Sequence, residues 1–349
     1  MSSSIVNSPR HYPRRPSNWA RYLVIFLVMP VVLLAIVGET YESLARSRDQ
    51  RQFRRWGELI DVGGYRLNLN CMGSGSPTVI LDSGLGLPAA EWSLLQPDVA
   101  EFTRVCSYDR AGYGWSDIGP SPRTSAQISN ELHTLLQNGA IRPPYILVGH
   151  SFGGFNLRVY THEHPHDVAG LILVESAHPD QLKRLPAQIR DSDQQQLRSL
   201  HRWQPFLPIL IHLGVQRIIL QSQPSPGIPS DVLQEIRYLQ LNSKFYDSML
   251  GEIDAMPQSI EQVRTAGTLG DRPLLVLTAA NAGEDLPPQF DREAFRKIWI
   301  TELQSSLAQL SSRGKQVIVP DTGHLIPLQQ PQAVVAAVRQ LLAAVPEHK

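Results

Sequence analysis

The chain has few cysteines, no excess charge of either sign and no internal repeat. Two cysteines, Cys71 and Cys106, are too few for a disulfide scaffold or a cysteine-based zinc site in 349 residues. Basic and acidic residues both number 32, so no net field attracts nucleic acid or an acidic partner. The sequence also lacks a P-loop. Charged residues make up 18% and hydrophobic residues 42%, which suits one large domain with an insertion.

The first fifth of the chain predicts a membrane anchor. Residues 1–18 are rich in Ser, Pro and Arg and carry no acidic residue, so we expect a disordered basic tail. Residues 19–38 carry Arg21 as their only charge, and about 20 apolar residues cross a bilayer as a helix. We expect a transmembrane anchor over 19–38, with Trp19 and Tyr22 at the interface, and then a charged helical stalk over 39–57. A cleaved signal peptide and a buried helix of a soluble protein are the alternatives.

Basic residues lie on both sides of this span, so its orientation is weakly specified. They are Arg10, Arg14 and Arg15 before it and Arg46, Arg48, Arg51, Arg54 and Arg55 after it. The positive-inside rule counts only the charges close to the membrane. We favour a single-pass topology in which the N-terminus lies in the cytoplasm and the following domain lies outside it.

Residues 145–154, Tyr-Ile-Leu-Val-Gly-His-Ser-Phe-Gly-Gly, carry the strongest chemical signal. A predicted buried strand runs into Gly149-His-Ser-Phe-Gly153, the G-x-S-x-G pattern of a nucleophile elbow, and helix-compatible residues follow. A serine at the tip of so tight a turn has a strained backbone, and glycine leaves the space needed two residues before and after it. We therefore predict that Ser151 is a nucleophile. A glycine-rich turn without a chemical role is the alternative.

The segment before the elbow predicts further strands and an oxyanion hole. Alternating residues around Gly63-Gly64 predict a hairpin over 58–70, and residues 78–81 and 104–108 predict buried strands. A glycine-bearing loop, Ser83-Gly-Leu-Gly86, follows the first of these strands. Such a loop supplies the second donor to an oxyanion hole, so we expect the backbone N–H groups of Leu85 and Phe152 to act together. A simple turn is the alternative.

Two polar residues follow predicted strands after the elbow. Residues 170–174 lead to Glu175, and residues 316–319 lead to Pro320-Asp-Thr-Gly-His324. A histidine after a strand and a glycine turn suits the general base that activates Ser151, and a carboxylate is then needed to orient the ring. We assign His324 as the base and expect Asp321 to shape its loop.

In combination, these motifs resemble an α/β-hydrolase. The residues that carry the resemblance are Ser-Gly-Leu-Gly at 83–86, Tyr-Asp-Arg-Ala-Gly-Tyr-Gly-Trp-Ser at 108–116 and Gly-His-Ser-Phe-Gly-Gly at 149–154. The chain is most similar to the membrane-anchored, esterase-like bacterial serine hydrolases. The resemblance implies an α/β fold with a mostly parallel eight-stranded sheet, helices on both faces, and hydrolytic activity without a cofactor or metal. It also implies a core built from residues 58–177 and 273–345 and a helical cap over residues 178–272.

The resemblance leaves the triad acid and the cysteines open. Several branches place the acid where Glu175 stands; most members place an aspartate after the next strand, where this chain has Asp285 without the usual short Gly-x-x-Asp arrangement. We favour Glu175. The strands that carry Cys71 and Cys106 are antiparallel neighbours in such sheets, so the two residues either pair as a disulfide or remain buried thiols.

The expected cap is unusually apolar and rich in helix formers. Its predicted helices are residues 194–203, 210–221, 232–250 and 260–266. We expect most of its apolar side chains to pack within the cap, some to line a substrate pocket, and a surface that dips into the bilayer as a further option.

These features predict a serine hydrolase that cleaves carboxylic esters of hydrophobic small molecules or lipids through an acyl-enzyme. The expected partners are such an ester and, through the N-terminal helix, a membrane, but not nucleic acid. An amidase, a thioesterase or a cofactor-free haloperoxidase-like enzyme with the same triad is the alternative, as is a non-catalytic membrane-bound ligand-binding protein. Serine at position 151 argues against dehalogenase and epoxide hydrolase chemistry, which uses a carboxylate nucleophile.

Overall fold

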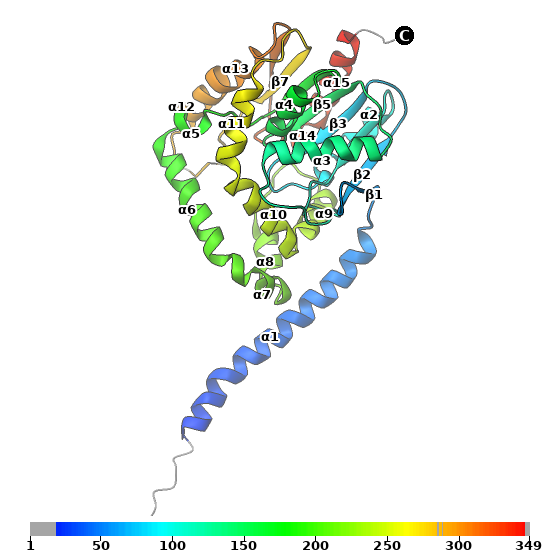
Figure 1. Cartoon of the computed structure of the whole chain (residues 1–349). Coiled ribbons are helices and arrows are strands. Elements are labelled where there is room, and N and C mark those ends of the chain that lie inside the picture. Colours follow the sequence, from blue (N-terminus) through cyan, green and yellow to red (C-terminus); the bar gives the residue numbers. More distant parts are fainter. Residues whose placement is uncertain (1–18, 285, 288, 346–349) are drawn as a thin grey trace, which may run out of the picture.

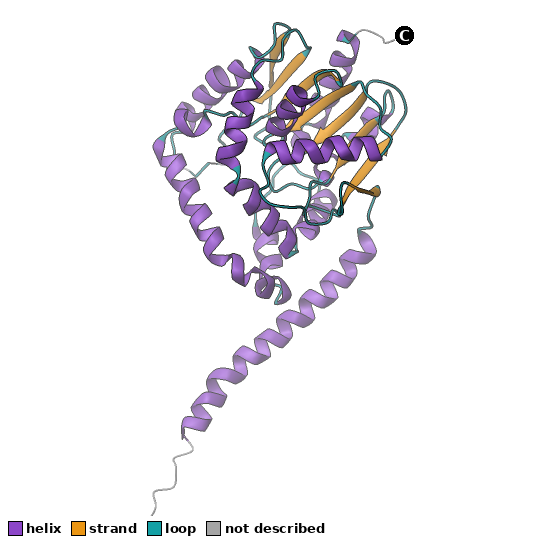
Figure 2. Cartoon of the chain, in the orientation of Figure 1, coloured by secondary structure: helices purple, strands orange, loops and turns teal. Residues whose placement is uncertain are grey.

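The computed structural model describes residues 19–284, 286–287 and 289–345, and its centre is one eight-stranded sheet (Figures 1 and 2). The spatial order of the strands is β1-β2-β4-β3-β5-β6-β7-β8. Their bounds are β1 (Glu58–Asp61), β2 (Arg66–Met72), β3 (Thr78–Asp82), β4 (Val105–Tyr108), β5 (Tyr145–His150), β6 (Val168–Val174), β7 (Leu274–Ala279) and β8 (Gly314–Val319). β2 is antiparallel to both β1 and β4, and every other pair is parallel. The predicted fold class is confirmed.

Helices cover both faces of this sheet, which explains why β3, β5 and β7 are buried along their whole length. On one face, α3 (Ser125–Asn138) and α4 (Gly153–Glu163) contribute Leu132, Leu135 and Tyr160 to a core cluster. On the other, η1 (Ala89–Trp92), α2 (Gln96–Ala100) and α15 (Pro331–Ala344) contribute to a second cluster. α12 (Arg292–Lys297), η3 (Ile298–Gln304), α13 (Ser305–Ala308) and α14 (Ile326–Gln329) complete the core.

The helices between β6 and β7 lie along the left and lower sides of the domain in the view of Figure 1. They are α5 (Gln181–Arg184), α6 (Ala187–Trp203), η2 (Gln204–Phe206), α7 (Leu207–His212), α8 (Val215–Ser222), α9 (Ser230–Gln240), α10 (Ser243–Asp254) and α11 (Met256–Ala266). Two predictions were wrong here, because 210–221 and 232–250 are each two helices. Gly214 adopts φ 71° and ends the first, while the Asn242 side chain accepts the N–H of Phe245 and starts a new helix.

One N-terminal helix, α1 (Trp19–Gln52), extends away from the sheet and is long and apolar enough to cross a membrane (Figure 1). Its side chains from Leu23 to Val37 are exposed apart from the half-buried Ala35. The helix continues beyond Gly38 but ends at Gln52, so the expected helical stalk is shorter than predicted. The tail predicted over residues 1–18 lies outside the described residues.

The two cysteines lie opposite each other in the antiparallel pair β2–β4. Cys71 and Cys106 form a disulfide between them. Of the two possibilities left open by the sequence, the structure has the disulfide.

Candidate active site

Ser151 lies at the turn between β5 and α4, in the backbone conformation that a nucleophile elbow requires. Its φ is 51°, in the left-handed region that costs a non-glycine residue free energy. A Cβ atom at Gly149 would lie 2.7 Å from the backbone nitrogen of Gly154, and one at Gly153 would overlap the carbonyl oxygen of Asp82. The two flanking glycines are therefore required by close backbone approach, for the steric reason that the motif suggests.

The ring of His324 bridges Ser151 and Glu175. Its Nε2 lies 3.1 Å from the Ser151 Oγ, and its Nδ1 lies 3.4 Å from a Glu175 carboxylate oxygen. A ring that donates its Nδ1–H to a carboxylate presents an unprotonated Nε2, which can accept the serine proton. Glu175 is buried, whereas the His324 side chain is 39% exposed and Ser151 is half-buried. A substrate can therefore reach the serine and the histidine but not the acid.

Glu175 is fixed by two further donors, one of which the sequence analysis missed. The backbone N–H of Ala279 donates to one carboxylate oxygen at 2.7 Å, and the indole N–H of Trp299 donates to the other at 3.0 Å. Trp299 lies in η3, a π-helical segment 124 residues after Glu175. No local pattern links residues so far apart, so only the tertiary structure identifies Trp299. The alternative acid, Asp285, lies outside the described residues.

The loop that carries Leu85 lies against the elbow. Leu85 packs on the apolar cluster that contains Phe152, and a Cβ at Gly84 would lie 2.8 Å from the His150 Nδ1. In the described part of the chain, neither the Leu85 amide nor the Phe152 amide donates a hydrogen bond. Both predicted donors thus come from adjoining segments, and no acceptor among the described residues uses either of them.

Arg110 shapes this loop, a role that its motif did not reveal. Its guanidinium donates to the carbonyl oxygens of Ser83 at 2.6 Å and Gly84 at 2.9 Å. It also forms buried ion pairs at 2.8 Å with Asp82 and with Glu252 of α10. Burial disfavours the Arg110 charge, but the two carboxylates outweigh it and keep the Arg110 pKa well above its usual value. One cation therefore connects β3, the Leu85 loop and the helices inserted after β6.

His150, at the end of β5, connects three parts of the site. Its Nδ1 lies 2.5 Å from a Glu91 carboxylate oxygen in a contact that is not aligned as a hydrogen bond, so we treat it as an ion pair. Its Nε2 lies 2.9 Å from the His324 carbonyl oxygen, and Glu91 also accepts the Gly84 N–H at 3.1 Å. Burial alone would lower the His150 pKa, but Glu91 outweighs it and raises the value. A cationic His150 pairs with Glu91 through Nδ1 and donates from Nε2 to the His324 carbonyl oxygen, which holds the His324 loop against the elbow.

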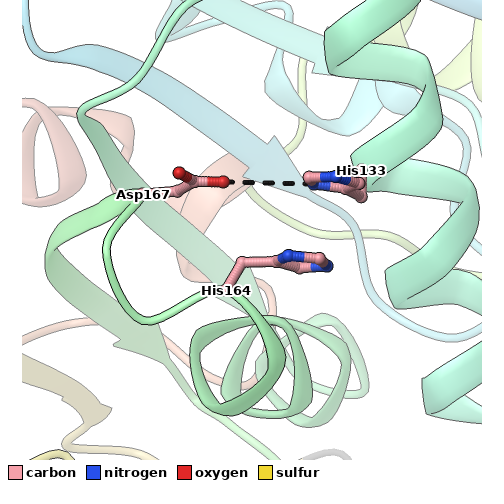
Figure 3. A group of neighbouring side chains, drawn as sticks. All are labelled: His133, His164 and Asp167. Atoms are coloured by element: carbon pink, nitrogen blue, oxygen red, sulfur yellow. Dashed lines mark ion pairs between the residues drawn. The ribbon is translucent and has the colours of Figure 1, made fainter.

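A second group of titratable side chains lies at the far end of α4 from Ser151 (Figure 3). The potential ligand atoms of His133, His164 and Asp167 lie within 4.8 Å of one another. However, the two rings are stacked, with centroids 3.8 Å apart and an angle of 2° between their planes. Parallel rings do not direct their nitrogen lone pairs to a common point, and the His133 Nδ1 already faces Asp167 at 4.0 Å. Ring stacking and a weak ion pair account for this group, and we assign no metal to it.

The chain is similar to known proteins both in sequence and in structure. A model of a family described as the alpha/beta hydrolase family matches residues 79–338. A probable transporter from Hormonema carpetanum is 32% identical over 136 residues, which cover 37% of this chain and 20% of that protein. The first three curated relatives are matched over only 20%, 63% and 42% of their own lengths. These partial matches do not transfer the activity of any whole relative.

Solved structures share the fold at low sequence identity. A thermophilic esterase from Thermogutta terrifontis with malate bound aligns with a TM-score of 0.58 and 21% identity, covering 84% of this chain and 98% of the esterase. An epoxide hydrolase, CorEH, aligns with a TM-score of 0.63 and 15% identity, covering 82% of this chain and 97% of the hydrolase. Because both identities are low, these neighbours establish the fold alone.

Proposed function

Because the chain belongs to the alpha/beta hydrolase family, we propose that it is a serine hydrolase that cleaves carboxylic esters of hydrophobic small molecules or lipids. Ser151 attacks the ester carbonyl carbon while His324 takes its proton, and Glu175 orients His324 and stabilises its cationic form. The amides of Leu85 and Phe152 bind the oxyanion. His324 then protonates the leaving alcohol, and a water molecule activated by the same ring hydrolyses the acyl-enzyme.

The observation that carries this proposal is the position of the His324 ring between the Ser151 hydroxyl and the Glu175 carboxylate. A carboxylate nucleophile, as in epoxide hydrolase chemistry, would need an acidic residue at position 151, where this chain has serine. The same triad could act on an amide or a thioester. The triad alone therefore does not determine whether the leaving group is an alcohol, an amine or a thiol.

Apolar surroundings of the serine favour a hydrophobic substrate. Phe152 packs in a cluster whose partly buried members include Leu85, Ala177, Met256 and Ile260. Of these, Met256 and Ile260 belong to α11, so the helices inserted after β6 pack against Phe152, the residue that follows the nucleophile. This arrangement supports our proposal that the insertion, residues 178–272, acts as a cap that selects the substrate.

We further propose that α1 is an uncleaved single-pass anchor and that the hydrolase domain is extracytoplasmic. The helix has the length and composition of a membrane span. The disulfide between Cys71 and Cys106 favours an oxidising compartment, since such bonds are rare in the cytosol. Protease protection of membrane vesicles of known sidedness tests this topology.

Reaction with a fluorophosphonate probe tests the serine chemistry. We expect the folded full-length protein to be labelled and the Ser151→Ala variant not to be. Ser107→Ala is a matched control, because Ser107 is a buried serine in strand β4 and has no proposed role in the chemistry. Absence of labelling, or labelling that survives Ser151→Ala, would favour the ligand-binding alternative.

A series of esters with increasing acyl length, together with the matching amides and thioesters, tests the substrate class. We expect hydrolysis of the esters, with kcat/KM rising as the acyl chain lengthens. Faster hydrolysis of the amides or thioesters would replace the proposed substrate class by one of its alternatives.

A further inference from the structure

Helix α8 has its apolar side outward. Val215, Ile218 and Ile219 follow the i, i+3, i+4 spacing of one helix face, and all three are exposed, Ile218 at 58%. The opposite face buries Gln216 and Arg217 together with one apolar residue, Leu220. Amphipathic helices of soluble proteins have the reverse arrangement, because exposing an aliphatic face to water costs free energy.

The neighbouring segment extends this exposed apolar surface. Trp203 at the end of α6, Phe206 in η2 and Ile209 in α7 are exposed at 52%, 51% and 57%. The Trp203 and Phe206 rings contact each other edge to face, with centroids 5.9 Å apart. We use the term apolar ridge for the six exposed residues Trp203, Phe206, Ile209, Val215, Ile218 and Ile219.

The apolar ridge is connected to α1 just where the predicted membrane span ends. A Cβ at Gly38 would lie 2.5 Å from the carbonyl oxygen of Leu213, and one at Gly214 would lie 3.0 Å from the Tyr41 ring, so α1 and the α7–α8 turn are in direct contact. Figure 1 shows α7 beside the middle of α1, at the edge of the domain from which the N-terminal half of α1 projects.

Buried ion pairs hold α8 in this position. Arg217 contacts Glu42 at 2.7 Å and Asp49 at 2.6 Å, and both carboxylates belong to α1. Glu42 lies five residues after Val37, the last of the continuous apolar residues, which is about 8 Å along a helix. The polar face of α8 therefore binds α1. The apolar face of α8 is exposed at about the level where the predicted membrane span of α1 ends.

We propose that the apolar ridge is embedded in the interfacial layer of the bilayer that α1 crosses. Aromatic and aliphatic side chains at this depth are stabilised, because the apolar face leaves water while the polar face keeps its protein partners. This placement sets the inserted helices against the lipid surface. Combined with the proposed function, on which this step rests, it implies that the ester substrate is taken from the membrane and not from the aqueous phase.

Fluorescence quenching by brominated lipids tests the placement without requiring activity. The full-length protein is reconstituted in phosphatidylcholine vesicles with plain or brominated acyl chains, together with Trp203→Phe and the control Trp115→Phe. The difference in emission between the wild type and Trp203→Phe reports on Trp203 alone. We expect this difference to be about twofold or more smaller in brominated vesicles than in plain ones, and the corresponding difference for Trp115→Phe to be the same in both. Equal emission of Trp203 in both vesicles would overturn the proposal, whether water or a second protein copy covers the ridge.

A kinetic comparison tests the implied source of substrate. Ile209→Ser with Ile218→Ser is compared with Ile118→Ser, whose side chain is 58% exposed on the hydrolase core. We expect the double variant to lose about tenfold in rate on a long-chain ester dissolved in the bilayer and to keep its rate on a water-soluble ester. Equal losses on both esters would refute uptake from the membrane. If no ester is hydrolysed, the proposed function fails, while bromine quenching still decides the placement of the ridge.

Discussion

At the scale of single residues, Glu175 is a carboxylate that the structure holds in position for one role, the orientation of His324. Ala279 and Trp299 each donate to its carboxylate, so the group is held in place beside His324. We expect Glu175→Gln to lower kcat about 10²–10⁴-fold with little change in KM, because an amide cannot stabilise the imidazolium or fix its tautomer. Steady-state kinetics on the best ester measures this.

Asp285→Asn is the matched control for this assignment. It removes the other candidate carboxylate by the same isosteric change, and we expect its kcat to stay close to wild type. If Asp285→Asn loses far more activity than Glu175→Gln, the acid has been assigned to the wrong strand.

His178, at the start of the insertion, gives a stability that depends on pH. The backbone N–H of Asp180 donates to its Nδ1 and its Nε2 faces the Ser306 hydroxyl, so the neutral ring is satisfied. Burial, helped by nearby arginines, lowers the His178 pKa to about 4. The unfolded chain therefore binds the proton more readily, and folding stability that is complete above pH 6.5 is lost as the pH falls towards 4.

Chemical denaturation between pH 7.5 and 4.5 measures this effect against His178→Gln. We expect the wild type to lose about 1–2 kcal/mol more than the variant over that range, after allowance for solvent screening of a partly exposed ring. Because all other titrating groups are shared, parallel curves for the two proteins would show that His178 is not the cause.

At the scale of elements, the sequence predicted structure wherever the cause is local. The elbow follows from steric limits within five residues, from Gly149 to Gly153. Strands were found because parallel strands covered on both faces are continuous apolar runs. Ser151 and His324 were predicted for the same reason, since each follows a strand at a recognisable turn.

Features that depend on distant partners could not be predicted. Trp299, Glu91 and Glu252 reach the site only through the folded chain, and their sequence surroundings are those of ordinary helices. The inserted helices were misjudged for a related reason: helix-forming residues on both sides of Gly214 gave no sign of the left-handed turn there. In α8, the exposed apolar face has the same periodicity as a buried one, so the sequence could not show which face is inside.

At the scale of the whole molecule, the ion pairs of Arg217 join the inserted helices to α1. We expect Arg217→Met to weaken this contact by up to about 3 kcal/mol, because Glu42 is 3% exposed and would keep only the partly exposed Arg46 as a partner. Amides of α7 and α8 should then exchange hydrogen faster in the reconstituted protein, while those of β5 should keep their protection.

Two further variants separate charge from packing in this contact. Arg66→Met breaks an ion pair whose side chains are 54% and 39% exposed, and it should leave exchange in α7 and α8 unchanged. Adding Glu42→Gln to Arg217→Met removes the buried carboxylate charge, which Arg46 alone would then face at 3.1 Å, and should restore part of the protection. If Arg217→Met behaves like Arg66→Met, the inserted helices are held by apolar contacts alone, and the position of the hydrolase domain on α1 does not depend on this buried cation.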